Sequence, residues 1–382
     1  MKIKSVESII LKSDLDTPFA FSQGWVAKRV CTLVKIITDD GLVGWGEGFA
    51  QGLEPPEICA AAIDHAFAPL LIGQNPLDTE KLWFEMYNRS RDFGRKGSVM
   101  AAISAVDIAL WDIAGQAYGQ PVYQLLGGAV RDEITPYATG FYRLKGQGEA
   151  GRLAEEATAH FEAGFRHMKV KLGFGVDDDI AVMAAIMKQV QGKDVQIMVD
   201  SNHAYGRTEA LRLGYALDAY DLRWYEEPVI PEDLAGYAAC RDKLKTPIAG
   251  GENEHALHGF KTLFEKEAVD VAQPDVGSCG GLTAMRHIAV LAHSFGVEVN
   301  PHVWGSSVAQ AASVHVLASL PVAHHSLFAR APILEYDRSD HPFRQHLVSE
   351  PLSLDEGVVK INHKPGLGIE ISQECIDRYR TN

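Results

Sequence analysis

The stretch QIMVDSN at residues 196–202 is a short apolar run that leads into the acid Asp200, and this pattern decides the fold. The same form recurs along the chain, in runs that end at or near Lys171, Glu226, Glu252, Asp275 and His302. These polar residues follow one another at intervals of 23 to 29 positions. One strand, one helix and two short loops fill such an interval. The pattern therefore predicts that each polar residue ends one strand of a parallel barrel, and that all of them face a single opening.

From about Thr135 onward, predicted strands and helices alternate. Eight strands are expected, at 135–140, 168–173, 197–202, 223–228, 247–252, 269–275, 297–302 and 331–337. Helices are expected between them, near 152–164, 178–190, 208–219, 232–244, 258–266, 281–295 and 306–320. Eight strands close a TIM-type barrel. A doubly wound open sheet is the alternative, but neither Gly250-Gly251 nor Gly280-Gly281 fits the GxGxxG turn that usually marks it.

Residues 1–125 do not show this alternation of strands and helices, and their pattern predicts a small α+β domain. A strand is expected at 2–13, and a hairpin at 31–47 that turns at Asp39-Asp40-Gly41. Three helices are expected to follow, at 56–71, 79–90 and 98–119. We assign the barrel to residues 126–352, and expect the tail, residues 353–382, to return to the first domain as strands.

Composition excludes several classes of partner. The formal net charge of −14 leaves no basic stripe, so nucleic acid is not an expected partner. The N-terminus lacks the pattern of a signal peptide, and no run approaches the roughly 20 apolar residues that span a membrane. The five cysteines are scattered without a CxxC pair, which favours reduced, buried thiols in a cytoplasmic enzyme.

Three of the strand-end residues are acids: Asp200, Glu226 and Glu252. Carboxylates from neighbouring strands form an all-oxygen ligand set, which suits Mg²⁺. A single acid in this place could equally cap the next helix or form a salt bridge, but three in register favour a metal site. Glu226 and Glu227 are adjacent and point to opposite sides of their strand, so spacing alone leaves open which of them is the ligand.

Basic residues flank these acids. Lys169 and Lys171 face the same side of one strand, and two ammonium groups beside a divalent cation make at least one of them a candidate base. Asp275 and His302 end adjacent strands, where the carboxylate can hold the imidazole tautomer and raise its basicity. Glu335 ends the eighth strand and could accept a hydrogen bond near developing charge, or form a salt bridge at the rim.

These motifs resemble those of the enolase superfamily, in its mandelate racemase and muconate lactonizing subgroup. KVK, VDSN, YEEP, GGEN, QPDVGSCGG, NPHVWG and ILEYD occur in the family's order, and AISAVDIALWDIAGQAYGQPVYQLLGG resembles its first signature. The resemblance covers essentially the whole chain. It implies a (β/α)7-8 TIM-type barrel with an N-terminal α+β capping domain that the C-terminal tail completes, and it implies a homo-oligomer.

The resemblance also implies a role for each strand-end residue. Glu226 rather than Glu227 joins Asp200 and Glu252 as a Mg²⁺ ligand. The catalytic bases are Lys171 and the His302–Asp275 dyad, while Lys169 holds the substrate carboxylate or enolate and Glu335 faces the enolate oxygen. The segments 16–29 and 50–55 close the site. Candidate substrate contacts are Phe19, Phe21, Trp25, Arg29, Asn202, His203 and His255.

The implied first step is removal of the proton α to a carboxylate, with Mg²⁺ and Lys169 stabilising the enediolate. DTPFAF, YNRSRDFGRKG and EYDRSDHPFRQ resemble sugar-acid cycloisomerases of the family, so ring opening of a lactone or anhydro-sugar acid is the expected reaction. Dehydration of a linear acid sugar is the first alternative and racemisation the second. Asn202 stands where galactonate-type dehydratases place a catalytic histidine, which argues against that type of site. A non-enzymatic protein of this fold would be expected to have lost these ligands and bases.

Overall fold

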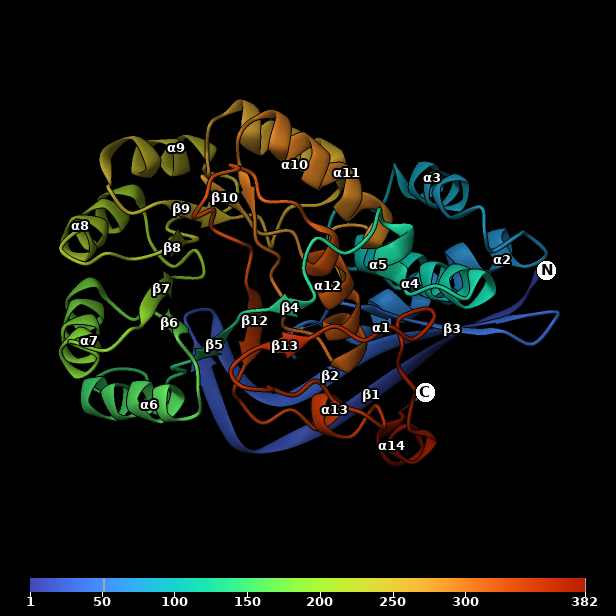
Figure 1. Ribbon diagram of the computed structural model, residues 1–382, viewed down its shortest axis with the longest axis horizontal. Helices are drawn as coiled ribbons and strands as arrows, with labels where there is room; N and C mark the ends of the chain where they lie inside the picture. The colour runs from blue at the N-terminus through green and yellow to red at the C-terminus, as the bar shows by residue number, and fades with distance from the viewer. Residues whose placement is uncertain (51, 382) are drawn as a thin grey trace.

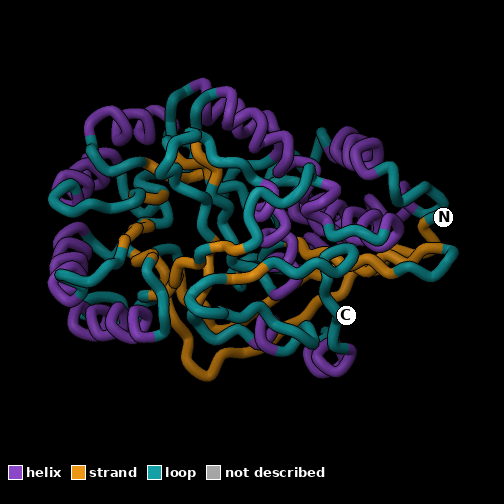
Figure 2. Tube along the Cα trace, viewed as in Figure 1, coloured by secondary structure: helices purple, strands orange, loops and turns teal. Residues whose placement is uncertain are grey.

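The computed structural model describes residues 1–50 and 52–381. A ring of parallel strands, surrounded by helices, stands beside a smaller α+β domain (Figures 1 and 2). The strands of the ring are β5 (Pro136–Gly140), β6 (His167–Lys171), β7 (Gln196–Asp200), β8 (Tyr225–Glu226), β9 (Ile248–Gly250), β10 (Val271–Ala272), β11 (Glu298–Val299) and β12 (Leu334–Asp337). They pair in the order β11-β10-β9-β8-β7-β6-β5-β12, so the predicted parallel, eight-stranded fold is confirmed.

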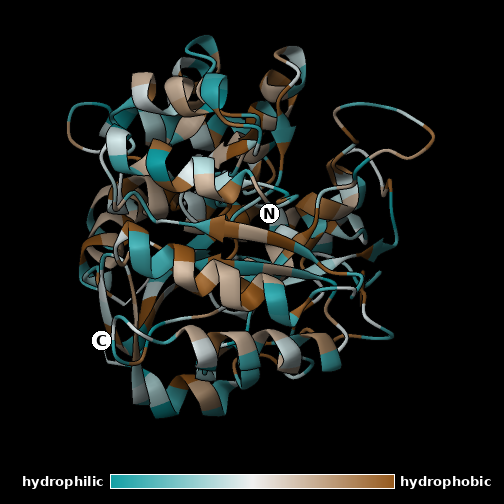
Figure 3. Ribbon diagram, turned by 90° about the vertical axis from the view of Figure 1, so that its left-hand side faces the viewer, coloured by the Kyte–Doolittle hydropathy of each residue, from teal (hydrophilic) through white to brown (hydrophobic). Residues whose placement is uncertain are grey.

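Seven long helices connect these strands: α6 (Ala150–Glu162), α7 (Val176–Gln189), α8 (Arg207–Leu217), α9 (Leu234–Lys243), α10 (Ala256–Glu265), α11 (Gly281–Ser294) and α12 (Ser307–Ser319). Each buries one face; on α6, for example, Leu153 and Ala157 are fully buried. Helices with hydrophilic and hydrophobic residues on different sides are visible in Figure 3. The last strand is followed directly by the four-residue α13 (Pro342–Gln345) and by no long barrel helix among the described residues, so the barrel has seven full strand–helix units and a final strand.

The smaller domain begins with an antiparallel sheet of β1 (Ile3–Phe21), β2 (Gly24–Thr38) and β3 (Val43–Gly48). The helices that follow are α1 (Pro56–Ala61), the π-helical turn η1 (Ala62–Phe67), α2 (Ala68–Leu71), α3 (Thr79–Ser90), α4 (Ser98–Tyr118) and α5 (Val122–Leu125). Apart from α5, which the sequence does not predict, these elements lie where they are expected. However, β1 and β2 are much longer than predicted, because residues 14–30 complete one long hairpin.

This hairpin reaches from the smaller domain to the barrel (Figure 1). Near its tip the amide of Ala20 donates to the carbonyl of Arg143 at 2.8 Å, and the Arg143 amide donates back at 2.9 Å. At the turn, the Ser22 hydroxyl donates to the carbonyl of Ser201 at 2.8 Å, and the Gln23 side chain donates to the carbonyl of Asn202 at 2.7 Å. The tip is therefore fixed directly over the C-terminal ends of β5 and β7.

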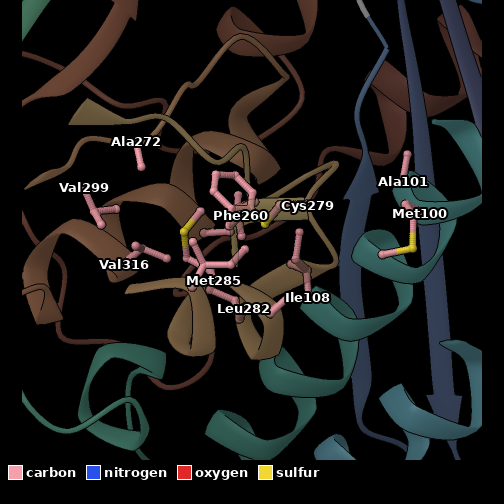
Figure 4. Close-up of a cluster of buried hydrophobic side chains, with 14 of the residues drawn as sticks. Met100, Ala101, Ile108, Phe260, Ala272, Cys279, Leu282, Met285, Val299 and Val316 are labelled. Atoms are coloured by element: carbon pink, nitrogen blue, oxygen red, sulfur yellow. The ribbon is translucent and has the colours of Figure 1, made fainter. Parts of the chain in front are cut away.

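Helix α4 forms the core between the two domains. It is long and apolar enough to cross a membrane by length and composition, which the sequence analysis did not anticipate, but 89% of its most apolar stretch is buried inside the protein. On one side it packs so closely on β3 that a Cβ atom on Gly46 would lie 1.9 Å from the carbonyl oxygen of Ala105. On the other side Ile108 points toward Cys279 and Leu282 of the barrel domain (Figure 4). A single apolar core thus spans both domains.

Buried acids of the smaller domain bind backbone groups across the domain boundary. Glu47 on β3 accepts from the amides of Ser306 at 2.8 Å and Ala309 at 3.0 Å, at the start of α12. Asp107 on α4 accepts from both the amide (2.9 Å) and the hydroxyl (2.6 Å) of Thr283 on α11. These carboxylates satisfy helix N-terminal N–H groups that have no partner within their own helix. They therefore fix the first turns of two barrel helices to the smaller domain.

The C-terminal tail lies along the first domain and adds no strand to its three-stranded sheet within the described residues. Its only strand among the described residues, β13 (Val359–Lys360), pairs antiparallel with β4 (Glu133–Ile134), at the entrance to the barrel. The amide of Leu367 donates to Asp112 of α4 at 2.9 Å, and α14 (Gln373–Tyr379) packs on β1. The tail completes the domain through α14, through loop contacts and through a short pairing with the open edge of β1, where the amide of Thr381 donates to the carbonyl of Ile10 at 3.0 Å.

One seam of the ring is closed by a side chain. Strands β11 and β12 are the two edges of the eight-stranded sheet, and no ladder joins them within the described residues. Across this seam, the Asn300 side-chain amide accepts from the amide of Ile333 at 2.8 Å and donates to its carbonyl at 3.1 Å. An Asn side chain has the donor and acceptor of a peptide group. Asn300 therefore takes the place of the missing ladder between the two edge strands, β11 and β12.

We expect Asn300→Ala to lower the free energy of unfolding by about 2–4 kcal/mol, because it leaves the buried N–H and C=O of Ile333 without partners. Urea unfolding measures this change. Asn88→Ala, at an exposed position on α3, is the control and should have little effect. Equal unfolding midpoints for the two variants would show that the side chain does not close the seam.

We expect Asp107 to make stability depend on pH. Burial, only partly offset by the hydrogen bonds from Thr283, raises the pKa of this carboxyl to about 7 in the folded protein. Between pH 4 and 7 the folded state therefore holds a proton that the unfolded state has lost. The free energy of unfolding, relative to that of Asp107→Asn, should fall by at most about 1.4 kcal/mol per pH unit as pH rises through this window. Parallel urea titrations from pH 4 to 8 test this, and a difference that does not change with pH would contradict it.

Candidate active site

Parallel pairing brings the strand-end residues to one level. Lys171 on β6 is the register partner of Asp200 on β7, and Asp200 is the partner of Glu226 on β8. Beyond β10 and β11, Asp275 and His302 pair in the same way. Because carboxyl ends of parallel strands share one edge of the ring, these side chains meet at its mouth.

Asp200, Glu226 and Glu252 form a carboxylate triad whose nearest oxygens all lie within 4.8 Å of one another. Asp200 and Glu226 are fully buried, and Oε2 of Glu252 is buried without a hydrogen-bond partner. Glu227 lies outside the triad; its backbone turns at a φ of 44°, and its Oε1 accepts from the Asn253 side chain at 2.7 Å. A hard divalent cation such as Mg²⁺ fits this all-oxygen set and would bind the oxygen of Glu252 that makes no hydrogen bond.

Lys169 lies beneath the triad and is fully buried. Its Nζ is 2.7 Å from Oε1 of Glu226 and 2.8 Å from Oε1 of Glu335. Burial by itself lowers the pKa of Lys169, but the two carboxylates outweigh burial and raise it well above the ordinary value. Lys169 is therefore a permanent positive charge at the base of the site.

Lys171 stands higher, at the floor of a pocket. Its Nζ donates to Oδ2 of Asp200 at 2.5 Å and to Oδ1 of Asn202 at 3.1 Å. Burial lowers the pKa of Lys171, but the charge of Asp200 outweighs burial and raises the pKa. The sequence predicts a proton that leaves easily, whereas the ion pair with Asp200 holds the proton on Lys171.

His302 and Asp275 form a buried dyad, with Nδ1 of the ring 2.7 Å from Oδ2 of the carboxylate. The other nitrogen, Nε2, faces Oε2 of Glu252 at 3.5 Å. Burial lowers the pKa of His302, but Glu252, Glu335 and Asp275 together raise it to about 10. Asp275 therefore orients the ring so that Nε2 points at the triad.

Supporting hydrogen bonds hold the acids in place. Oε2 of Glu226 accepts from the side chains of Trp224 at 2.8 Å and Gln273 at 2.7 Å. Glu335 accepts from the Thr139 hydroxyl at 2.7 Å and from the amide of Val303 at 2.9 Å. Burial raises the pKa of Glu335, but Lys169 and His302 outweigh it and lower the pKa below the ordinary value. Glu335 is thus an ionised partner of Lys169 and is shielded from solvent.

Two connected hollows open above these residues. The inner one, here named the reaction pocket, has a volume of only about 10 Å³, enough for the reacting atoms of a substrate, and is lined by Phe21, Tyr142, Lys171, Asn202, Glu252, His302 and Trp304. The outer pocket has a volume of about 280 Å³ and shares Phe21, Asn202 and Glu252 with it. Lys171 and His302 thus face one small space from different strands. A substrate bound there would lie between two titratable groups.

The predicted substrate contacts fall into two groups. Phe21 and Asn202 line both pockets, and His203 and His255 line the outer one. Arg29 and Trp25 line neither. The Arg29 guanidinium is buried behind the wall, 3.2 Å from Asp337 and stacked on Trp304, whereas Trp25 is half exposed. Of the predicted closing segment 50–55, Leu53 and Glu54 line the outer pocket, and residue 51 lies outside the described residues.

The sequence gives no indication of several lining residues, namely Phe49, Gly97, Ser98, Ala101, Tyr142, Asn253, Ser278 and Trp304, whereas Gln23 lies in the predicted closing segment 16–29. Trp304 could have been found, since it follows His302 by two residues and extends the same strand end. Tyr142 likewise lies two residues beyond β5. Phe49 and Ser278 come from loops without a period, and the amide of Phe49 donates to the carbonyl of Gly277 at 2.9 Å. Only the fold brings these two loops together.

The ring of parallel strands and the polar groups at its mouth place the chain among barrel enzymes whose chemistry occurs at the strand ends. Residues 5–127 match the family model described as "Mandelate racemase / muconate lactonizing enzyme, N-terminal domain", and residues 152–375 match "Enolase C-terminal domain-like". The chain belongs to the enolase superfamily, in the mandelate racemase and muconate lactonizing subgroup.

Individual relatives agree with this assignment. D-galactarolactone cycloisomerase of Agrobacterium fabrum is 41% identical over 100% of this chain and 99% of its own length. Arabinonate dehydratase of Saccharolobus solfataricus is 33% identical over 91% of this chain and 89% of its own. The crystal structure of the 3,6-anhydro-D-galactonate cycloisomerase from Zobellia galactanivorans superposes with a TM-score of 0.89 at 39% identity, covering 100% of both chains. A racemase from Streptomyces coelicolor with bound magnesium has a TM-score of 0.88 at 28% identity, covering 99% of this chain and 100% of its own.

Adjacent glutamates test the metal site. We expect Glu226→Gln to weaken Mg²⁺ binding at least tenfold, because it removes one charged oxygen ligand from the triad. Glu227→Gln is the matched control and should bind Mg²⁺ within about twofold of the parent protein, since its side chain lies outside the triad. Calorimetric titration with Mg²⁺ measures both. If only the Glu227 variant bound Mg²⁺ more weakly, Glu227 and not Glu226 would be the ligand.

Proposed function

We propose that this protein opens the ring of a sugar-acid lactone or anhydro-sugar acid by Mg²⁺-dependent removal of the proton α to a carboxylate, followed by β-elimination. The observation that carries the proposal is the reaction pocket, where Lys171 and the His302–Asp275 dyad flank one space beside the carboxylate triad. Similarity over the full chain to two cycloisomerases supports the choice of ring opening.

The fixed charges of the chain orient the substrate. Asp200, Glu226 and Glu252 would hold Mg²⁺, whose charge would stabilise the substrate carboxylate and the enediolate and would offset the carboxylate charges that raise the pKa of Lys171 and His302. Lys169 contributes a further positive charge that Glu335 holds in position from below. The metal site and Lys169 would stabilise negative charge where it develops in the transition state, and burial strengthens this effect.

Proton transfer then falls to the two pocket-facing groups. The group on the side of the α-hydrogen, Lys171 or His302, takes that proton in its neutral form. The C–H electrons form the double bond to the β-carbon, and the β C–O bond of the ring breaks. An ether oxygen takes a proton from the opposite group, whereas a lactone oxygen departs as a carboxylate. The resulting enol becomes a 2-oxo-3-deoxy acid by tautomerisation.

Dehydration of a linear acid sugar is the second candidate, since the same bases would expel a β-hydroxyl group. Arabinonate dehydratase, a relative at 33% identity, supports it. Racemisation is a third, because two groups that face one pocket permit reprotonation from the opposite side.

Turnover in D₂O distinguishes these reactions. We expect aldarate lactones or anhydro-sugar acids to yield 2-oxo-3-deoxy acids in the presence of Mg²⁺, and chelation with EDTA to stop the reaction. Products are followed by NMR across a panel of cyclic and linear acid sugars. Conversion of linear acids but not cyclic ones would establish the dehydratase, and the absence of both product and α-deuterium exchange throughout the panel would refute an enolase-type reaction.

Replacing the bases tests their assignment. We expect Lys171→Ala and His302→Asn each to reduce kcat by at least a thousandfold, because each removes a group that transfers a proton. Mg²⁺ affinity, measured by calorimetry, should change by no more than about threefold in either variant. A loss of Mg²⁺ binding that accounts for the lost activity would remove that residue from the role of base.

We also propose a cytoplasmic, homo-oligomeric protein. The five cysteines are all free and buried, which suits a reducing compartment. Leu327 and Phe328 are 90% and 89% exposed on the loop before β12, which supports contact with another copy.

A further inference from the structure

The two pockets differ in the kind of charge they offer a ligand. The reaction pocket contains Lys171 and His302 beside the proposed Mg²⁺ site, so it can neutralise one carboxylate. The outer pocket continues from it past Asn202 and Glu252. Among the described residues that line the outer pocket, none is a lysine or an arginine. Lys96, which adjoins the lining residue Gly97, is paired with Glu254 at 2.8 Å.

The outer pocket instead presents neutral hydrogen-bonding groups that have no partner of their own. Ser278 is only 5% exposed, and its hydroxyl oxygen has no hydrogen-bond partner among the described residues. Nε2 of His255 accepts from the amide of Gly97 at 3.1 Å, which places the proton of the neutral ring on Nδ1. That Nδ1 is buried without a well-formed hydrogen bond, although the backbone of Asn253 lies near enough to act on the ring in the direction that raises its pKa.

His255 does not supply a positive charge to the outer pocket. Burial, with a smaller effect from Lys96, lowers the pKa of His255 to about 4, so the ring is uncharged at neutral pH. A hydroxyl without a partner at Ser278 and a ring N–H without a well-formed hydrogen bond at His255 are costly in a buried wall unless a ligand satisfies them. A hydroxyl group can both donate to and accept from such partners, whereas a buried carboxylate would need a cation that the wall does not offer.

We infer that the outer pocket binds hydroxyl groups at the far end of the substrate, through Ser278 and His255, so that the substrate carries one free carboxylate. This inference rests on the proposed function, which places that carboxylate in the reaction pocket. It selects aldonates, anhydro-aldonates and the lactones of aldarates, whose second carboxyl is esterified within the ring. It rejects open-chain aldarates, which carry a carboxylate at each end.

A matched pair of ligands tests the charge at the far end. The Mg²⁺-loaded protein is titrated calorimetrically with galactonate and galactarate, which differ only in whether C6 is a hydroxymethyl group or a carboxylate. We expect galactarate to bind at least tenfold more weakly at pH 8, where ordinary imidazoles are uncharged. Equal or tighter binding of galactarate would overturn the inference, even if lactones are converted. Discrimination by charge in a protein that converts no acid sugar would uphold the inference and refute the proposed function.

Two variants identify the groups responsible. We expect Ser278→Ala and His255→Gln each to raise the dissociation constant for galactonate about fivefold to thirtyfold while changing that for Mg²⁺ by less than twofold. Glutamine can still accept from the amide of Gly97, so the second variant chiefly removes the Nδ1 donor. Ser294→Ala, at an exposed site on α11, is the control. If both pocket variants bind galactonate as the control does, these residues do not recognise the substrate.

Discussion

Six carboxyl groups meet only three basic side chains at the mouth of the barrel, and this excess of buried negative charge governs the site. Asp200, Glu226, Glu227, Glu252, Asp275 and Glu335 face Lys169, Lys171 and His302. Carboxylates that cannot all be paired must hold protons or attract a cation. Burial, with neighbouring acids, raises the pKa of Glu226 to about 7 and that of Glu227 well above its ordinary value. The excess of buried carboxyl groups therefore favours both binding of a metal ion and, when the ion binds, release of the protons that these groups hold.

Much of the site could be predicted from the sequence, because residues at regular intervals along the chain end neighbouring parallel strands at the same edge of the ring. Asp200, Glu226, Lys171 and the Asp275–His302 pair each end a strand, and the register sets them at one level. The alternation of side chains along a strand could not show which of Glu226 and Glu227 is the metal ligand. The family resemblance favours Glu226, and the backbone supplies a physical reason: at Glu227 the chain leaves the strand with a φ of 44°.

The remaining features depend on long-range contacts that no local pattern encodes. Residues 14–30 include two acids, a proline and a glycine, which disfavour a strand when considered alone. They extend β1 and β2 because Ser22, Gln23 and Ala20 find partners on the barrel. The wall formed by Phe49 and Ser278 likewise exists only because the smaller domain docks there, and Glu47 and Asp107 fix that docking to α12 and α11.

The seam at Asn300 gives the ring an unequal stiffness. Elsewhere neighbouring strands are joined along the backbone, whereas β11 and β12 are joined through side chains: Asn300 bonds to the backbone of Ile333, and Glu335 accepts from the amide of Val303. His302 follows β11 and Glu335 belongs to β12, so these two residues lie on opposite sides of the join, with Nε2 and Oε2 3.9 Å apart. A change in the circumference of the barrel would concentrate at this joint. The imidazole could then shift relative to the carboxylates of β7 and β8 while their own spacing stays unchanged.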